Sequence, residues 1–228
     1  MNKLYIKTLS IEITRRCNMV CAHCMRGDPE NLDINHQHIR SLLKHVTHVH
    51  RLTITGGEPS LNPKAIRYIL KQLKSFNIHV YDFYIVTNGS ISSMSDQFIS
   101  VCSDLFDYQE NKDLEEHSHM LELSDDRFHD KTLHEKVTAK LRLYPFFGTR
   151  GQSQNIYLFK EGRCTTGEQN KVHHIYLTSE NYVYGDIYLN AKGNILGNGN
   201  LSYQRQLENE LCHVNKLREY LKTTLRKD

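Results

Sequence analysis

Apolar and polar residues alternate along four segments within the first 145 residues, and this period of two predicts β-strands. In the first of them Leu4, Ile6 and Leu9 are apolar, with one slip near Lys7. Four intervening stretches place apolar residues at helical spacing instead. The predicted strands are 4–14, 51–55, 80–87 and 120–123, and the predicted helices are 35–46, 63–76, 95–105 and 132–143. Because parallel strands need crossover connections, this alternation predicts an α/β fold with a parallel sheet.

The pattern changes after about residue 144. Segments rich in Tyr and Ile replace the strand–helix alternation, and a charged helical pattern follows them. The segments rich in Tyr and Ile are 155–159, 174–178 and 182–189; the predicted elements are a turn over 190–194 and a helix over 205–226. We therefore expect two parts, a core over 1–145 and a small C-terminal α+β extension over 146–228.

The composition is that of a soluble folded protein. The chain has 228 residues, of which 39% are hydrophobic and 24% are charged, and its net charge of +3 is too small to indicate a nucleic-acid partner. No segment approaches the roughly 20 apolar residues that a membrane span requires. The first residues, MNKLYIKTLSIEI, alternate in polarity and offer no signal-peptide core. We therefore expect a cytoplasmic protein that has no membrane partner.

Three of the six cysteines lie close together in a C-x3-C-x2-C run directly after the first predicted strand. In a reducing compartment, clustered cysteines indicate a metal site more often than disulfides, and thiolates favour zinc or iron–sulfur centres. Because a structural zinc or a saturated 4Fe-4S cluster takes four protein ligands, the three thiols of Cys17, Cys21 and Cys24 leave one position open. The alternative is a zinc loop with His23 or a distant residue as the fourth ligand.

This run, followed by Gly56-Gly57-Glu58-Pro59 at the end of the second predicted strand, resembles the radical S-adenosylmethionine superfamily. The resemblance covers about residues 4–145. It implies a partial (β/α)6 TIM-like barrel, here followed by the C-terminal extension. It also implies one 4Fe-4S cluster on Cys17, Cys21 and Cys24. An external electron donor such as flavodoxin or ferredoxin would reduce this cluster.

The resemblance further implies that S-adenosylmethionine binds the open iron and is cleaved to a 5′-deoxyadenosyl radical, which abstracts a substrate hydrogen. Glycines without Cβ atoms would let the backbone approach the methionyl group closely, and carbonyls or Glu58 could meet its ammonium. The cofactor-binding residues that it implies are Gly56, Gly57, Glu58, Pro59, Asn88, Ser124, Asp126 and His23.

Several of these residues have a plain structural alternative. Asn88-Gly89 is also a turn signal, and Ser124 with Asp126 could cap a helix. His23 departs from the aromatic residue that the family commonly has at this position, although an imidazole could also stack on adenine. Asp126 and His129 are candidate catalytic residues as an acid–base pair.

The remaining candidates lie in or near the extension. Arg150 is either an active-site cation or an ordinary loop arginine. Residues 187–196 are similar to a hairpin of the auxiliary-cluster extension in peptide-modifying members of the family. Because only Cys164 and Cys212 lie in the extension, we expect a single cluster. Cys102 is expected to pack in the core.

Four functional hypotheses follow. The first is modification of a peptide or protein, and it rests on the hairpin-like segment. The second is a small-molecule reaction of the 7-carboxy-7-deazaguanine synthase type, because the chain is short and has one cluster. Activation of a glycyl-radical enzyme is the third. A non-catalytic zinc or iron–sulfur module is the alternative from a different class of protein.

Overall fold

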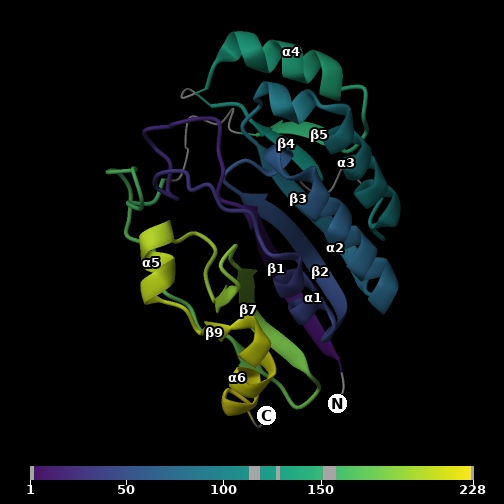
Figure 1. The fold of residues 1–228 in the computed structure, drawn as a ribbon, viewed down its shortest axis with the longest axis vertical. Coiled ribbons are helices and arrows are strands. Elements are labelled where there is room, and N and C mark those ends of the chain that lie inside the picture. The colour runs from purple at the N-terminus through teal and green to yellow at the C-terminus, as the bar shows by residue number, and fades with distance from the viewer. Residues whose placement is uncertain (1–2, 113–118, 127–128, 151–157, 227–228) are drawn as a thin grey trace.

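The computed structural model describes residues 3–112, 119–126, 129–150 and 158–226, and nine strands in this part of the chain form one sheet (Figure 1). The strands are β1 (Leu4–Thr14), β2 (Val46–Gly56), β3 (His79–Thr87), β4 (Leu121–Ser124), β5 (Phe147–Arg150), β6 (Tyr176–Leu177), β7 (Tyr182–Leu189), β8 (Asn194–Leu196) and β9 (Cys212–His213). Their order is β5-β4-β3-β2-β1-β7-β8-β9, and β6 pairs with β7. All neighbours from β5 to β7 are parallel, whereas β6, β8 and β9 pair antiparallel.

Helices cover one face of the parallel strands, and Figure 1 shows α2, α3 and α4 along the same side of the sheet. The α-helices are α1 (His36–Leu43), α2 (Pro63–Phe76), α3 (Asp96–Tyr108), α4 (Lys131–Leu141), α5 (Tyr203–Glu208) and α6 (Leu217–Thr223). Short 3-10 turns are η1 (Pro59–Leu61), η2 (Ile91–Met94) and η3 (Val214–Lys216). Local chemistry sets the ends of α2, because the Asn62 side chain accepts from the Ala65 amide and the left-handed Asn77 ends the helix.

The two faces of the parallel sheet differ in polarity. Leu52 and Ile54 of β2 are fully buried in the core that β2 shares with the helices. The alternate residue Thr53 pairs with Ser10 of β1 on one side and with Tyr84 of β3 on the other. Because successive side chains of a strand point to opposite faces, these polar residues form a second, hydrophilic face, which we call the pocket face.

The predicted fold class is confirmed, since the structure is a mixed α/β fold with a mostly parallel and open sheet. The predicted strand 4–14 and helix 63–76 match β1 and α2 at both ends, and the Tyr- and Ile-rich segment 182–189 forms β7. The predicted helix 35–46 is too long, because α1 ends at Leu43 and β2 begins at Val46. Hydrogen-bonded pairing with β1 along its whole length extends β2 toward its N-terminal end.

The predicted helix over 205–226 is wrong as a single element. It is divided into α5, the short strand β9 and α6. Cys212 pairs with Ile195 of β8, and this sheet pairing interrupts the helix. A strand was also not expected at 147–150, where β5 pairs in parallel with β4. Of the Tyr- and Ile-rich segment 155–159, residues 155–157 lie outside the described residues, and Phe159 makes an isolated bridge with Glu168.

Both predicted parts of the chain contribute to the same sheet. β5 and β7 come from the predicted extension, yet β5 pairs with β4 and β7 pairs with β1. The division of the chain at residue 145 stays a prediction. Within the described ranges, every helix is too short or too polar to cross a membrane.

Candidate active site

The three clustered cysteines lie in the loop that follows β1, at the carboxyl edge of the parallel strands. Catalytic groups on barrel folds are found at this edge. Cys17, Cys21 and Cys24 are partly exposed, and none of them forms a disulfide. A turn brings two of them together, since the Cys24 amide donates to the Cys21 carbonyl over 3.1 Å. The Asn88 side-chain amide contacts the Cys17 Sγ at 3.7 Å.

The chemistry of this loop fits a cationic metal centre. Burial raises the pKa of the Cys17 thiol, and nearby Cys24 and Glu58 raise it further. The pKa of Cys21 is raised by burial and by the charges of Cys17 and Cys24. Three thiolates therefore repel one another in this loop, and a bound metal cluster would remove this repulsion.

Gly56 and Gly57 let the end of β2 pass very close to the start of the cysteine loop. A Cβ on Gly56 would lie 2.3 Å from the Thr14 carbonyl oxygen, and one on Gly57 would lie 2.3 Å from the Arg16 carbonyl oxygen. The Gly57 amide donates to the Thr14 carbonyl over 2.8 Å. The glycines are thus required for packing against the backbone that precedes Cys17. Their contact with a methionyl group stays a prediction.

Glu58 is buried, with an exposed fraction of 1%. Its Oε1 accepts from the Ser60 amide at 3.0 Å and from the Thr87 hydroxyl at 2.8 Å, and its Oε2 accepts from the Asn88 amide at 2.8 Å. The carboxylate therefore joins the end of β2 to the end of β3. Burial raises the pKa of Glu58, although these hydrogen bonds oppose the rise.

A cavity of about 350 Å³ opens beside these strand ends. It brings together six of the predicted cofactor-binding residues, namely Gly56, Gly57, Glu58, Pro59, Asn88 and Ser124. Arg150, at the end of β5, also lines the cavity. His23 and Asp126 do not line it. A cavity of this volume lies within the usual range for small-molecule sites.

His23 and Asp126 instead lie with His129, beside the cysteine loop. The His129 Nδ1 and an Asp126 carboxylate oxygen are 2.7 Å apart, and both side chains are mostly buried. The rings of His23 and His129 meet edge to face with centroids 5.8 Å apart. One potential ligand atom from each of the three residues lies within 4.8 Å of the others, a spacing that a metal ion could also use. Burial lowers the pKa of His23, which favours its neutral form.

Sequence reasoning missed much of the pocket wall. The polar wall residues that it missed are Ser10, Arg26, Thr53, Thr55, Tyr84, Tyr188 and Asn200. The strand pattern carried a signal for some of them, because Ser10 and Thr53 are polar residues between buried apolar ones. No local signal marks Tyr188 or Asn200, which reach the pocket from the C-terminal part of the chain.

A chain of hydrogen bonds runs along the pocket face at β3, β4 and β5. The Arg150 guanidinium donates to the Tyr84 hydroxyl over 2.8 Å, and that hydroxyl donates to the Glu122 carboxylate over 2.7 Å. Burial and the bond to Glu122 raise the pKa of Tyr84 to about 12, so the phenol remains protonated at neutral pH. Arg150 thus lies at the pocket wall, and its role as an active-site cation stays a prediction.

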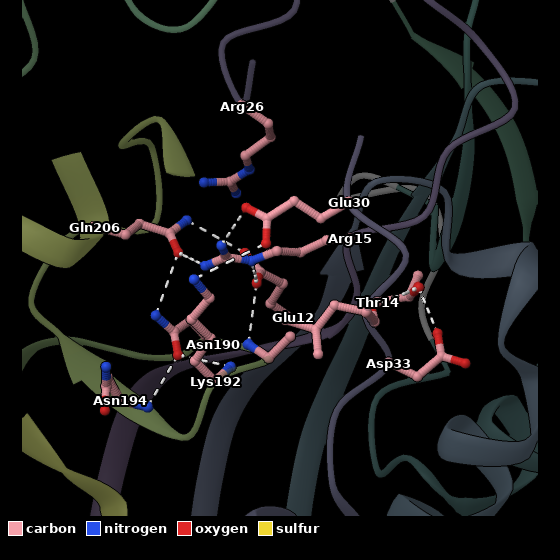
Figure 2. Close-up of polar contacts among 12 residues, drawn as sticks. Glu12, Thr14, Arg15, Arg26, Glu30, Asp33, Asn190, Lys192, Asn194 and Gln206 are labelled. Atoms are coloured by element: carbon pink, nitrogen blue, oxygen red, sulfur yellow. Dashed lines mark hydrogen bonds and ion pairs between the residues drawn. The ribbon is translucent and has the colours of Figure 1, made fainter. Parts of the chain in front are cut away.

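A buried polar network holds the base of the cysteine loop (Figure 2). Arg15 and Glu12 are both fully buried and form an ion pair of 2.8 Å. The Arg15 guanidinium also donates to Glu30 and to Gln206, each at 2.7 Å. Burial lowers the pKa of Arg15, but Glu12 and Glu30 more than offset this effect and the pKa ends above its usual value. The residue two positions before Cys17 is therefore fixed in one place.

The chain is thus an open, mostly parallel α/β half-barrel that carries three thiols beside a polar pocket at the carboxyl edge. A sequence model of the Radical SAM superfamily matches residues 11–133, which is more than half of the chain. The chain belongs to the Radical SAM superfamily. No curated protein matches it.

Solved structures of anSMEcpe share its fold at low sequence identity. Native anSMEcpe with bound AdoMet and Cp18Cys peptide superimposes with a TM-score of 0.59 and 11% identity, covering 96% of this chain and 83% of that one. Hexahistidine-tagged anSMEcpe with bound AdoMet gives a TM-score of 0.55 and 12% identity, covering 96% and 80%. Streptococcus suis SuiB bound to precursor peptide SuiA gives 0.37 and 16%, covering 54% and 25%. The similarity to anSMEcpe shows the fold alone.

Membership of the superfamily implies an enzyme that uses S-adenosylmethionine and an iron–sulfur cluster. The loop after β1 fits the iron–sulfur cluster, because its three thiols lie together and form no disulfide. The pocket beside it fits a small polar cofactor, since hydroxyl, amide and guanidinium groups line its wall.

Proposed function

We propose that this chain is a radical S-adenosylmethionine enzyme that acts on a peptide or protein. Cys17, Cys21 and Cys24 would hold one 4Fe-4S cluster, which takes electrons from a flavodoxin or ferredoxin. The observation that carries the proposal is the position of these thiols at the carboxyl edge, beside the pocket. When bound, the cluster and S-adenosylmethionine supply a 5′-deoxyadenosyl radical that removes a substrate hydrogen atom.

The residues of the chain would bind and orient the cofactor. The backbone at Gly56 to Pro59 would face the methionyl group, and the Asn88 side chain lies beside Cys17. The hydroxyl of Ser124 and the cation of Arg150 lie across the cavity wall from β2, where they could meet a carboxylate. Asp126 and His23 do not line this cavity, so their contact with the nucleoside portion of the cofactor stays a prediction.

The size and position of the pocket support a peptide substrate. A cavity of about 350 Å³ holds the cofactor and leaves room for only a small substrate group. Tyr188 and Asn200 bring the C-terminal part of the chain to the wall opposite β3. A peptide could insert one side chain there while its backbone remained outside. The Asp126–His129 pair is the candidate acid–base group for this reaction.

Anaerobic reconstitution with iron and sulfide tests the proposal. We expect a brown protein that binds four irons per chain and forms 5′-deoxyadenosine from S-adenosylmethionine with dithionite, because three thiolates leave one iron open. Each of the single replacements Cys17→Ala, Cys21→Ala and Cys24→Ala should abolish the formation of 5′-deoxyadenosine. Cys212→Ala is the matched control, because Cys212 is also partly exposed but lies in β9. A colourless protein with one zinc and no product would contradict the proposal.

The peptide assignment has its own experiment. Each short peptide encoded beside the gene for this chain would be synthesised with deuterium on its side chains and added to the reduced enzyme. Direct hydrogen abstraction should transfer deuterium into 5′-deoxyadenosine, which mass spectrometry detects. The control is a labelled peptide of equal length whose sequence is not encoded beside the gene. If 5′-deoxyadenosine forms but carries no deuterium from any peptide, the substrate belongs to another class.

A further inference from the structure

The segment after residue 158 packs directly on the cysteine loop. The Arg163 amide donates to the Cys24 carbonyl over 2.9 Å. Gly162 has a left-handed backbone, with φ of +58°, and a Cβ there would lie 2.4 Å from the Gly27 amide nitrogen and 2.7 Å from the Cys24 carbonyl oxygen. The two backbones therefore touch beside the third cysteine. This contact holds Arg163 at the loop.

The Arg163 side chain is mostly buried, with an exposed fraction of 20%. Its one described ion pair is with Asp28, at 3.3 Å, and the Asp28 side chain is 88% exposed. The Arg163 Nε is buried and has no hydrogen-bond partner within the described ranges. A buried charged donor without an acceptor costs free energy, so this atom is suited to a partner that the chain itself does not supply.

The charge of Arg163 acts on the metal-binding side of the loop. Burial raises the pKa of Cys21, and the Arg163 guanidinium opposes this rise. Burial lowers the pKa of His23, and Arg163 lowers it further. The guanidinium therefore lies within electrostatic reach of Cys21 and His23 in the cysteine loop. The exposed Asp28 carboxylate neutralises it weakly, because solvent screens that pair.

We propose that the Arg163 guanidinium raises the reduction potential of the cluster, with its buried Nε–H directed toward a cluster or cysteine sulfur. This inference rests on the proposed cluster site. Reduction adds one electron from the external donor and so makes the cluster more negative by one charge. A nearby cation and a hydrogen bond to sulfur both stabilise the more negative state, and both are known to set such potentials.

The test is a redox titration of the reconstituted full-length protein without S-adenosylmethionine, followed by electron paramagnetic resonance. Arg163→Gln should shift the midpoint potential to a more negative value, because it removes the charge. Arg163→Lys keeps the charge and loses the Nε donor, so its midpoint should lie between those of the other two proteins. Lys160→Gln is the matched control, because it removes an exposed cation from the same segment and should leave the potential unchanged.

Iron and sulfide content, measured in every sample, separates the two proposals. A wild-type protein that takes up no cluster contradicts the proposed function itself. A full cluster in Arg163→Gln with the wild-type midpoint overturns the role of Arg163 and leaves the proposed function intact. If Arg163→Gln cannot hold the cluster, the test uses the midpoint potential of Arg163→Lys. A midpoint potential equal to that of the wild type then overturns the proposal. An equal shift in Lys160→Gln would also overturn it, since any nearby cation would then suffice.

Discussion

At the residue scale, Glu58 is an ionisable side chain that has a structural role. It is almost fully buried, and its two oxygens accept three hydrogen bonds from the chain. Those donors come from the turn after β2 and from the end of β3. The carboxylate therefore sets the spacing of two strand ends that line the pocket.

Glu58→Gln should destabilise the folded chain without changing the shape of the side chain. The amide nitrogen would face the donor of either Ser60 or Asn88, and a buried donor left without an acceptor costs about 1–3 kcal/mol. Urea denaturation followed by circular dichroism measures the loss. Glu135→Gln, at an exposed position, is the control and should change the free energy of unfolding by less than about 0.5 kcal/mol.

The pH dependence of this loss has a definite sign. Because burial raises the folded-state pKa of Glu58, the folded chain binds more protons than the unfolded chain between the usual pKa of Glu and the raised value. The free energy of unfolding of the wild type therefore falls as pH rises through that window. Glu58→Gln lacks this titrating group, so its free energy of unfolding should not fall through the same window. A deficit that grows with pH would contradict this assignment.

At the residue scale, the sequence identifies functional side chains when several of them lie close together along the chain and form a motif. The three cysteines and the Gly56–Pro59 run are short motifs, and all lie at the carboxyl edge. Arg163 could not be found in this way, because its relation to the loop depends on a contact between positions 139 residues apart, Cys24 and Arg163. The same reason hides Tyr188 and Asn200.

At the scale of elements, periodicity alone predicted most of the parallel sheet and its crossovers. Helix α2 was predicted at both ends because Pro63 suits the first turn and the apolar stripe from Ile66 to Leu73 runs at helical spacing. Period two also predicted β1, in which Leu4 and Ile6 are buried and alternate with exposed residues. These signals are strong because each depends on residues within one turn or one strand.

Periodicity failed where a distant strand decides the structure. The region 205–226 has helical character, but β8 recruits Cys212 and His213 into the sheet and divides the helix. Residues 147–150 include a glycine and an arginine and resemble a loop, but β4 provides a hydrogen-bonding partner there. Tertiary pairing overrides local propensity in both cases, so the last strand at each end of the sheet was missed.

At the scale of the whole molecule, the C-terminal segment and the loop that precedes the cysteines share one buried charge network (Figure 2). Glu12 accepts from Arg15 and from the backbone amide of Ala191 through Oε1. Its Oε2 accepts from the Tyr188 hydroxyl at 2.7 Å and from Gln206. One carboxylate of β1 therefore orders both β7 and α5, elements that are remote in sequence.

Glu12→Ala should therefore loosen the C-terminal segment as well as destabilise the chain. It leaves the fully buried Arg15 without the fully buried carboxylate that pairs with it, and breaking a buried ion pair costs about 3–5 kcal/mol. Hydrogen exchange should accelerate at the turn that contains Ala191, whose amide loses its acceptor. Denaturation measures the first effect and mass spectrometry of exchanged peptides measures the second.

Glu30→Ala is the matched control for this prediction. Glu30 contacts the same Arg15 at 2.7 Å, but its side chain is 38% exposed, so solvent screens this pair and its loss should cost less than the loss of the fully buried Glu12. The amide of Ala191 does not depend on Glu30, so its exchange should be unchanged. Equal losses of stability in the two variants would mean that burial of the Glu12 carboxylate does not decide the strength of the network. Unchanged exchange at Ala191 in Glu12→Ala would mean that β1 and the C-terminal segment are held together by apolar packing instead.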